Sequence, residues 1–270
     1  MMTIKLALIQ MQTAPDREEN LAKVEDLITV AAGQGADIVV LPEMFSIPYA
    51  AAWMRSSMET MEGEIVQLLR RFASDNYINL LGGTFPELAD SERCYNTSLF
   101  INREGEIIAS HRKLHLFDAA LDGEDFTEST LVVPGDSPTV FDTEYGKMGI
   151  AICYDMRFPE LFLRMAQLGA RLIFVPAAFS RVTGPQHWEV LVRSRAMDNQ
   201  LFVAACSPAS APDLPFDPYG CSMVVDPWGE IIGESGRHED LLQVEIDLDT
   251  IEEVRKKLPL MEHRRPEVYI

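Results

Sequence analysis

The sequence has few basic residues, few cysteines and no long apolar run. Its 270 residues contain 23 Lys and Arg against 42 Asp and Glu, a formal net charge of −19. Nucleic acids and anionic membrane surfaces require clustered positive charge, so this balance argues against either as a partner. No stretch reaches the roughly 20 apolar residues that span a bilayer, and the N-terminus lacks the pattern of a signal peptide. We therefore expect a cytoplasmic protein.

Metal and cofactor motifs are also missing. The four cysteines, Cys94, Cys153, Cys206 and Cys221, include no Cys-x-x-Cys pair, which argues against a disulfide framework and a four-cysteine zinc site. There is no His-Glu-x-x-His motif and no glycine-rich phosphate loop. We expect the four cysteines to be free thiols, one of which can be reactive, and we expect no metal or cofactor.

Apolar segments of strand length alternate with amphipathic segments of helix length along the whole chain, and 47% of the residues are hydrophobic. Residues 4–11 predict a buried strand. Asp16 and Glu19 have the spacing of a capping box, which predicts the start of a helix. Residues 37–41 are rich in β-branched side chains and predict a second strand, ended by Pro42. The first unit is therefore strand, helix, strand.

A second unit of the same kind follows later in the chain. Residues 147–153 predict a strand, a helix begins near Pro159, and another strand follows Gly169. The side chains expected on the inward face of this helix are Leu161, Phe162, Met165 and Leu168. Residues 35–42 and 169–176 place Gly, Ala and Pro at the same offsets, which suggests an internal duplication.

Two such units bury both faces of their strands only where helices cover the outside. We therefore expect a layered α/β fold in a single domain over residues 1–270. The other expected elements are strands at 78–84, 98–101, 106–111, 221–225 and 230–233, and a helix at 184–199.

Two candidates for chemistry follow the predicted strands. Glu43 comes directly after 37–41, where partial removal from water raises a carboxylate pKa toward the range of a general base; alternatively, it caps the next segment or pairs with a cation. Cys153 lies where 147–153 turns into the next helix, so the thiol is lifted out of the sheet and backbone N–H groups beyond it can stabilise an oxyanion. Free cysteines are mostly small buried hydrophobic residues, which is our interpretation of Cys206.

A third candidate is Lys113, in the basic cluster His111-Arg112-Lys113-Leu114-His115 of an otherwise acidic chain. An ammonium group beside a cysteine lowers the thiol pKa and stabilises negative charge on an attacked carbonyl. The alternative is a solvated surface run, and the spacing alone does not decide. Arg157 and Glu160 are three residues apart, and we expect them to pair across a helix start and brace the turn after Cys153.

Together, three motifs resemble the signatures of the nitrilase superfamily of carbon–nitrogen hydrolases. They are Leu41-Pro42-Glu43, Arg112-Lys113-x-His115-Leu116-Phe117-Asp118 and Ile152-Cys153-Tyr154-Asp155-x-Arg157-Phe158-Pro159-Glu160-Leu161. The resemblance covers nearly the whole chain, and three motifs in this order are far more specific than any one of them. It implies a four-layer αββα sandwich, a Glu-Lys-Cys triad, cleavage of non-peptide C–N bonds and at least a homodimer.

The resemblance also implies roles by position. Glu43 is the general base, Lys113 stabilises the oxyanion and Cys153 is the nucleophile. Glu128 falls where many members have a second glutamate that orients the lysine or the substrate. Four aromatic residues are candidates for the walls of the substrate pocket by proximity alone: Tyr49, Phe117, Tyr154 and Phe179.

Within the superfamily, motifs such as Asp198-Asn199-Gln200 and Asp226-Pro227-Trp228-Gly229 resemble the omega-amidase branch. This implies a thiol amidase acting on small dicarboxylic-acid monoamides such as 2-oxoglutaramate or 2-oxosuccinamate. A protein of net charge −19 repels a carboxylate unless donors gather locally, and the candidates are Lys113, Arg112 and backbone N–H groups after Cys153. The alternatives are a deaminated-glutathione amidase, a Cys-His hydrolase, and an inactive binding or scaffold protein.

Overall fold

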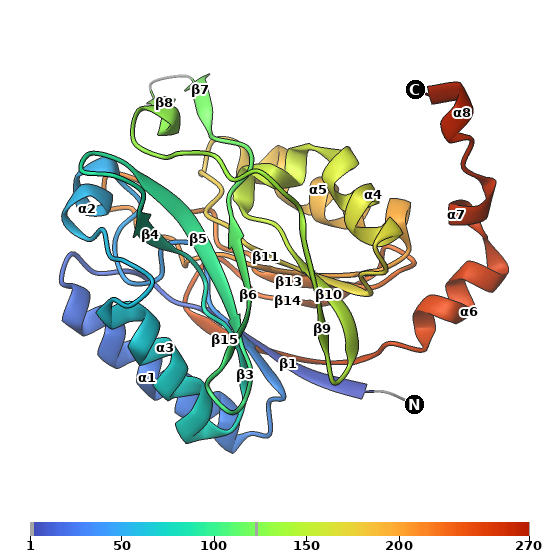
Figure 1. Ribbon diagram of the computed structural model, residues 1–270, viewed down its shortest axis with the longest axis horizontal. Helices are drawn as coiled ribbons and strands as arrows, with labels where there is room; N and C mark the ends of the chain where they lie inside the picture. Colours follow the sequence, from blue (N-terminus) through green and yellow to red (C-terminus); the bar gives the residue numbers. More distant parts are fainter. Residues whose placement is uncertain (1–2, 122–123, 270) are drawn as a thin grey trace.

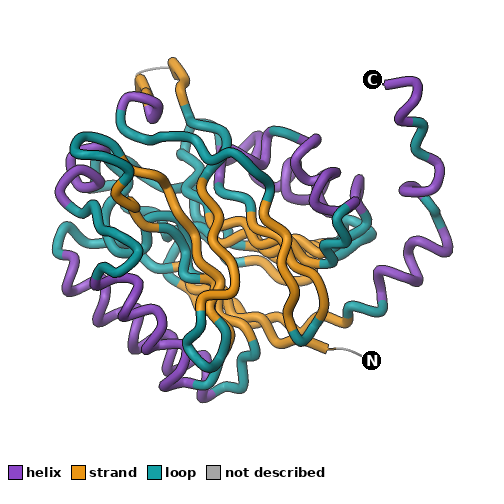
Figure 2. The backbone as a smooth tube through the Cα atoms, viewed as in Figure 1, coloured by secondary structure: helices purple, strands orange, loops and turns teal. Residues whose placement is uncertain are grey.

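The chain forms two β-sheets stacked face to face, as the computed structural model, which describes residues 3–121 and 124–269, shows (Figures 1 and 2). The first sheet has the spatial order β15 (Asp240–Asp247), β1 (Thr3–Gln10), β2 (Ile38–Val40), β3 (Asn79–Leu81), β5 (Cys94–Ile101) and β4 (Phe85–Leu88). Its seventh strand, β6 (Ile107–Arg112), also pairs with β5. The second contains, in spatial order, β14 (Ile231–Glu234), β13 (Met223–Val225), β12 (Phe202–Cys206), β11 (Leu172–Pro176), β10 (Gly146–Ile150) and β9 (Thr139–Thr143). The strands β7 (Asp118–Leu121) and β8 (Glu124–Thr127) form a separate two-stranded sheet.

Helices cover both outer faces of the stacked sheets (Figure 1). The helices of the described residues are α1 (Arg17–Gly33), α2 (Ala51–Ser56), α3 (Glu64–Asn76), α4 (Pro159–Gln167), α5 (Gly184–Asn199), α6 (Thr250–Lys257), α7 (Leu260–His263) and α8 (Pro266–Tyr269). The pair α1 and α3 packs on the first sheet, and α4 and α5 pack on the second. The expected four-layer αββα sandwich is therefore confirmed. Within the described residues, no helix is long and apolar enough to cross a membrane.

The central strands have apolar side chains on both faces because both faces are covered. On β11, Leu172 and Phe174 point into the core between the sheets, whereas Ile173 and Val175 pack against α4 and α5. On β2, Val40 faces the core between the sheets and Val39 faces α1 and α3. This strict alternation fixes the register of each strand, since a slip of one residue would exchange its two faces.

The two expected units occupy equivalent places in the two sheets. The strands β1 and β2 pair in parallel around α1, and β10 and β11 pair in parallel around α4. Gly35 and Gly169 lie at the same offset and both have positive φ, +86° and +99°, a conformation that glycine adopts without strain. The Asp16 side chain caps α1 by accepting a hydrogen bond from the Glu18 N–H at 2.9 Å.

Several expectations need correction. The strand β10 ends at Ile150 rather than at residue 153, because the Ile152 N–H bonds to the Asp155 carboxylate instead of a neighbouring strand. Leu168 is 39% exposed rather than inward-facing, since α4 ends at Gln167. The elements that the sequence did not indicate are β4, β7, β8, β9, β12, β15, α2, α3, α6, α7 and α8. A single domain over 1–270 stays a prediction.

Candidate active site

The four residues expected to carry the chemistry come together at the ends of separate strands. Glu43 follows β2, Lys113 follows β6, Cys153 follows β10 and Glu128 follows β8. Glu43 and Lys113 are fully buried, and Cys153 is 7% exposed. Lys113 is therefore not a solvated surface charge. Because strands from both sheets end here, the site lies at one rim of the sandwich, as binding crevices of α/β proteins commonly do.

Cys153 occupies a tight turn between β10 and α4. It begins a short 3₁₀ helix, Cys153–Arg157, and its φ is +45°, which is unfavourable for a residue with a Cβ. The Asp155 carboxylate supports the turn by accepting hydrogen bonds from Ile152 N–H at 2.9 Å and His115 N–H at 2.9 Å. Burial raises the pKa of the Cys153 thiol, and the nearby backbone N–H of Ala178 lowers it only in part.

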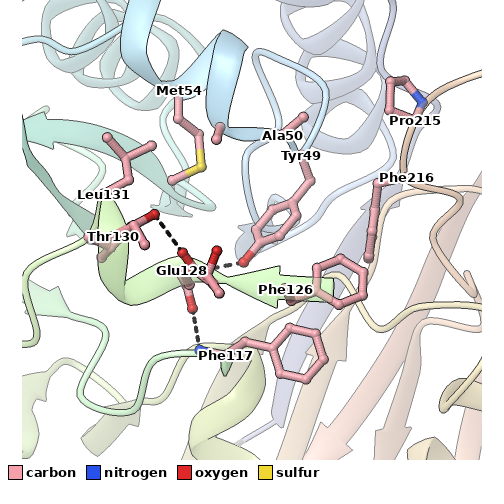
Figure 3. Close-up of a pocket in the computed structure, with 13 residues that line it drawn as sticks. Tyr49, Ala50, Met54, Phe117, Phe126, Glu128, Thr130, Leu131, Pro215 and Phe216 are labelled. Atoms are coloured by element: carbon pink, nitrogen blue, oxygen red, sulfur yellow. Dashed lines mark hydrogen bonds between the residues drawn. The ribbon is translucent and has the colours of Figure 1, made fainter. Parts of the chain in front are cut away.

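Lys113 lies between two carboxylates. Its Nζ is 3.1 Å from Glu43 Oε1 and 2.9 Å from Glu128 Oε1. Glu128 also accepts hydrogen bonds from the Tyr49 hydroxyl at 3.0 Å and the Phe117 N–H at 2.7 Å (Figure 3). Burial alone lowers the pKa of Lys113, but the Glu128 and Glu43 charges outweigh it and raise that pKa well above its usual value. The ammonium group is therefore permanently charged.

The acid–base properties of Glu43 and Cys153 follow from their burial. Burial raises the pKa of Glu43, and the Lys113 charge lowers it only in part. Burial and the nearby Glu43 charge raise the pKa of the Cys153 thiol well above its usual range. The resting thiol is therefore protonated, and it needs a base at the moment of attack. Among the described residues, Glu43 Oε2 has no hydrogen-bond partner and is free to take that proton.

A cavity of about 10 Å³ lies against the Cys153 thiol, close to the room that one water molecule needs. All four aromatic residues expected at the pocket contribute to its wall: Tyr49, Phe117, Tyr154 and Phe179. The remaining residues of the wall are Arg157, Ala178, Ser180 and Thr183. A second cavity of about 260 Å³ shares Tyr49 and Phe117 with the first, and Glu128 lies on its wall (Figure 3). The substrate contacts of the four aromatic residues stay a prediction.

Neither of the two arginines near the motifs lies where the sequence predicted it. The Arg112 side chain points away from the site: it donates to Glu87 Oε2 at 2.9 Å and lies 3.7 Å over the Tyr95 ring. It is therefore not a donor for the substrate. Arg157 faces the cavity instead, and its Nη1 lies 3.2 Å from His187 Nδ1. Within residues 3–121 and 124–269 no carboxylate, Glu160 included, forms an ion pair with it. The sequence signal for a role of Arg157 at the cavity was its position in the same motif as Cys153.

The histidines near the motifs bond to Asp155 rather than to the thiol. His115 Nδ1 is 2.8 Å from Asp155 Oδ1, and His111 Nε2 is 3.4 Å from Asp155 Oδ2. This arrangement argues against a Cys-His hydrolase. In the described part of the chain, no group of three or more His, Cys, Asp or Glu side chains could hold a metal ion.

Sequence reasoning missed Asn96. This residue lies on β5, is fully buried, and donates from Nδ2 to Glu43 Oε1 at 2.8 Å. The strand expected at 98–101 did not include this residue, and its neighbours Thr97 and Ser98 are also polar, so no local pattern marked it.

Known proteins of the same kind share this architecture. The family model of the carbon–nitrogen hydrolases matches residues 5–256. The chain belongs to the carbon–nitrogen hydrolase family. Omega-amidase NIT2 of Mus musculus is 43% identical over 270 residues, covering 100% of this chain and 98% of the mouse protein. Omega-amidase NIT3 of Saccharomyces cerevisiae is 43% identical over 275 residues, covering 98% of this chain and 94% of the yeast protein.

Solved structures agree with this assignment to the carbon–nitrogen hydrolases. The crystal structure of S. cerevisiae Nit3, a member of branch 10 of the nitrilase superfamily, has a TM-score of 0.89 at 42% identity and covers 97% of each chain. A mutant amidase of Nesterenkonia sp. AN1 has a TM-score of 0.80 at 25% identity, covering 98% of this chain and 95% of that one. It carries the acetamide moiety of fluoroacetamide covalently added at its active-site cysteine. The predictions of the family and of an amidase are confirmed, and an inactive scaffold is not supported.

Proposed function

We propose that this protein is a thiol-dependent amidase that releases ammonia from the terminal amide of small dicarboxylic-acid monoamides, with 2-oxoglutaramate and 2-oxosuccinamate as the preferred substrates. The main support for this proposal is the position of the Arg157 side chain. Its guanidinium group lines the Cys153 cavity without a carboxylate partner among the described side chains: Nη1 lies 3.2 Å from His187 Nδ1, and the buried Nε has no hydrogen-bond acceptor there. A substrate carboxylate would supply the acceptor that Nε lacks, since guanidinium and carboxylate groups match as bidentate pairs.

Electrostatics favour a role for Arg157 in substrate binding. Two carboxylates, Glu43 and Glu128, surround the single Lys113 charge, so these three groups carry a net negative charge that repels an anionic substrate. Arg157 offsets this repulsion where the substrate enters. Its guanidinium carbon also lies 5.1 Å from the Phe179 ring centroid and 5.5 Å from that of Tyr154, which holds the planar group between two walls of the cavity. The full-length relatives named omega-amidases support the same substrate class.

The acylation step uses the groups around the thiol. Glu43 takes the Cys153 proton as the sulfur attacks the amide carbonyl, and the carbonyl oxygen becomes an oxyanion that the Lys113 ammonium group stabilises. Glu43 then gives this proton to the amide nitrogen, the C–N bond breaks, and ammonia leaves. The product of this half-reaction is a thioester between the acyl group and Cys153.

The deacylation step repeats this sequence with water. Glu43 takes a proton from a water molecule as its oxygen attacks the thioester carbonyl, and Lys113 again stabilises the oxyanion. The C–S bond breaks, the carboxylic acid leaves, and the sulfur recovers a proton from Glu43. Water and amide are consumed, and acid and ammonia are formed.

Steady-state kinetics on a panel of amides tests the substrate class. Ammonia release is measured for 2-oxoglutaramate, 2-oxosuccinamate, glutamine and butyramide. For deaminated glutathione, whose amide nitrogen belongs to its cysteine residue, the released cysteinylglycine is measured instead. Cys153→Ala is the blank. We expect the highest kcat/KM for the two 2-oxo acids. A butyramide value equal to that of 2-oxoglutaramate would contradict the proposed specificity, and a clear preference for deaminated glutathione would favour the alternative amidase.

We further propose a homodimer or higher homo-oligomer in the cytoplasm, with no nucleic acid or membrane partner. Cys94, Cys153, Cys206 and Cys221 are all free, which suits a reducing compartment. Light scattering coupled to size-exclusion chromatography measures the mass of the assembly; a mass of one chain would contradict the oligomer.

A further inference from the structure

We propose that Asn96 is a positioning residue that decides which oxygen of Glu43 acts as the base. Asn96 Nδ2 donates to Glu43 Oε1 at 2.8 Å and lies 3.5 Å from Glu128 Oε1. The inference rests on the role of Glu43 as the base in the proposed function. It adds the group that orients this base.

The geometry shows how one amide acts on the base. Lys113 Nζ contacts the same two oxygens as Asn96 Nδ2, so Glu43 Oε1 receives two donors. Within the residues that the structure describes, Glu43 Oε2 receives none and is buried. An oxygen that already accepts two hydrogen bonds is a poorer proton acceptor than its free neighbour. Asn96 and Lys113 together therefore hold the carboxylate with Oε2 as the basic atom.

The backbone of Asn96 links it to Lys113 as well. The Lys113 N–H donates to the Asn96 carbonyl at 2.9 Å, where β5 runs beside the end of β6. One residue thus bonds to the main chain of the lysine and to the side chain of the base. The distance between Lys113 and Glu43 is set through Asn96 as well as by their direct contact.

The chemistry of the site explains why an amide stands here. The groups that face Glu43 are the Lys113 ammonium, the Glu128 carboxylate, the Cys153 thiol and the Tyr49 hydroxyl. A second cation would stabilise ionised Glu43 and make it a weaker base, whereas another carboxylate would repel it. An amide N–H orients Glu43 without adding charge. Asn96 Oδ1 is buried and has no hydrogen-bond partner among the described residues. The hydrogen bond from Nδ2 to Glu43 is therefore the contact that favours Asn at this position.

Two variants and a matched control test the proposal. Asn96→Leu removes the donor at similar volume, and Asn96→Asp replaces the amide by a carboxylate of the same shape. The control is Ser98→Ala, two residues further along β5, where the buried hydroxyl has no hydrogen-bond partner in the described part of the chain. The control therefore removes a buried polar atom from the same strand without touching Glu43.

The readout is the pH dependence of Cys153 alkylation by iodoacetamide, followed by the mass of the Cys153 peptide. This rate depends on the base and the thiol but not on the identity of the amide substrate, so it remains informative if the proposed substrate class fails. A donor to the charged form of Glu43 lowers its pKa, so its loss moves the acidic limb of the profile to higher pH. We expect a shift of about one unit in Asn96→Leu, a larger shift in Asn96→Asp, and none in Ser98→Ala.

A purely structural role gives a different result. It lowers the alkylation rate at every pH and leaves the midpoint of the acidic limb where it is in the wild type. That outcome, in whichever Asn96 variant gives a cooperative thermal unfolding transition, would overturn the proposal. Since Asn96→Asp preserves the shape of the side chain, it decides the question if Asn96→Leu does not fold.

Discussion

Replacing Arg157 should reduce the activity on anionic substrates much more than the activity on neutral ones. We consider Arg157→Met, which keeps a long apolar stem against the Phe179 and Tyr154 rings but removes the guanidinium group. If this group binds the substrate carboxylate, the variant loses hydrogen bonds to a charged partner only when the substrate carries that carboxylate. The loss should then be large for 2-oxoglutaramate and much smaller for butyramide.

The size of the effect follows from the kind of contact. A hydrogen bond to a charged group contributes about 1.5–3 kcal/mol, and about 1.4 kcal/mol corresponds to a factor of ten. The expected fall in kcat/KM for 2-oxoglutaramate is therefore roughly 10- to 150-fold. Because the carboxylate is distant from the reacting carbonyl, ground state and transition state lose the same contact, and most of the change should appear in KM.

The assay is ammonia release from both substrates by wild type, Arg157→Met and a surface control. The control, Arg181→Gln, removes the same charge from a side chain that is 66% exposed, and it should change kcat/KM by no more than about twofold. Arg157→Lys retains the charge but not the planar fork, so it should fall between wild type and Met. An equal loss for both substrates in Arg157→Met would refute the reasoning and assign Arg157 to the support of the turn.

The remaining predictions concern the nucleophile, the lysine and the turn. Lys113→Met should lower kcat by ~10² to 10³, as for other oxyanion donors, and an unchanged kcat with a raised KM would contradict that role. Cys153→Ala should abolish ammonia release with little change in Tm. Cys206→Ala should keep activity, but its free energy of unfolding in urea should fall by about 1 kcal/mol, because the Cys206 sulfur packs between the sheets. The reverse pattern would exchange the roles of the two cysteines. Hydrogen bonds from His111, His115 and the Ile152 N–H outweigh burial and hold the pKa of Asp155 well below its usual range. The ionised Asp155 therefore stabilises the fold above about pH 4, and this contribution to the free energy of unfolding falls as the pH drops toward the pKa of the folded state. Asp155→Asn should therefore be less stable than wild type by about 1–3 kcal/mol at pH 7, with a gap that narrows in acid; a gap independent of pH would contradict the assignment.

The local elements of the fold were predictable because their signals lie within a few residues. The helix expected at 184–199 matches α5, and Asp16 caps α1 as expected, although through the Glu18 N–H rather than through a capping box with Glu19. Gly35 and Gly169 mark the two equivalent turns through their positive φ. The strand β15 was not predicted, since its place beside β1 depends on a pairing in which Thr3 meets Asp247, at opposite ends of the chain.

The three motifs likewise located Glu43, Lys113 and Cys153, because each occupies a fixed position after a strand. The resemblance implied that Glu128 orients either the lysine or the substrate. The structure places Glu128, which follows the separate β7–β8 sheet, 2.9 Å from Lys113. The motifs could not show Asn96, since no local pattern connects a residue in the middle of β5 with Glu43.

The two arginines show most clearly what only the tertiary structure decided. In the sequence, Arg112 stands next to Lys113 and Arg157 stands four residues after Cys153, and both could have served the substrate. Successive side chains of an extended strand point in opposite directions, so when Lys113 turns inward Arg112 must turn outward, where Glu87 meets it. Arg157 ends the 3₁₀ turn that begins at Cys153, and this turn returns its side chain to the cavity. The sequence by itself determined the family and located the candidate catalytic residues. The positions of the charges around these residues depend on segments that meet only when the two sheets stack.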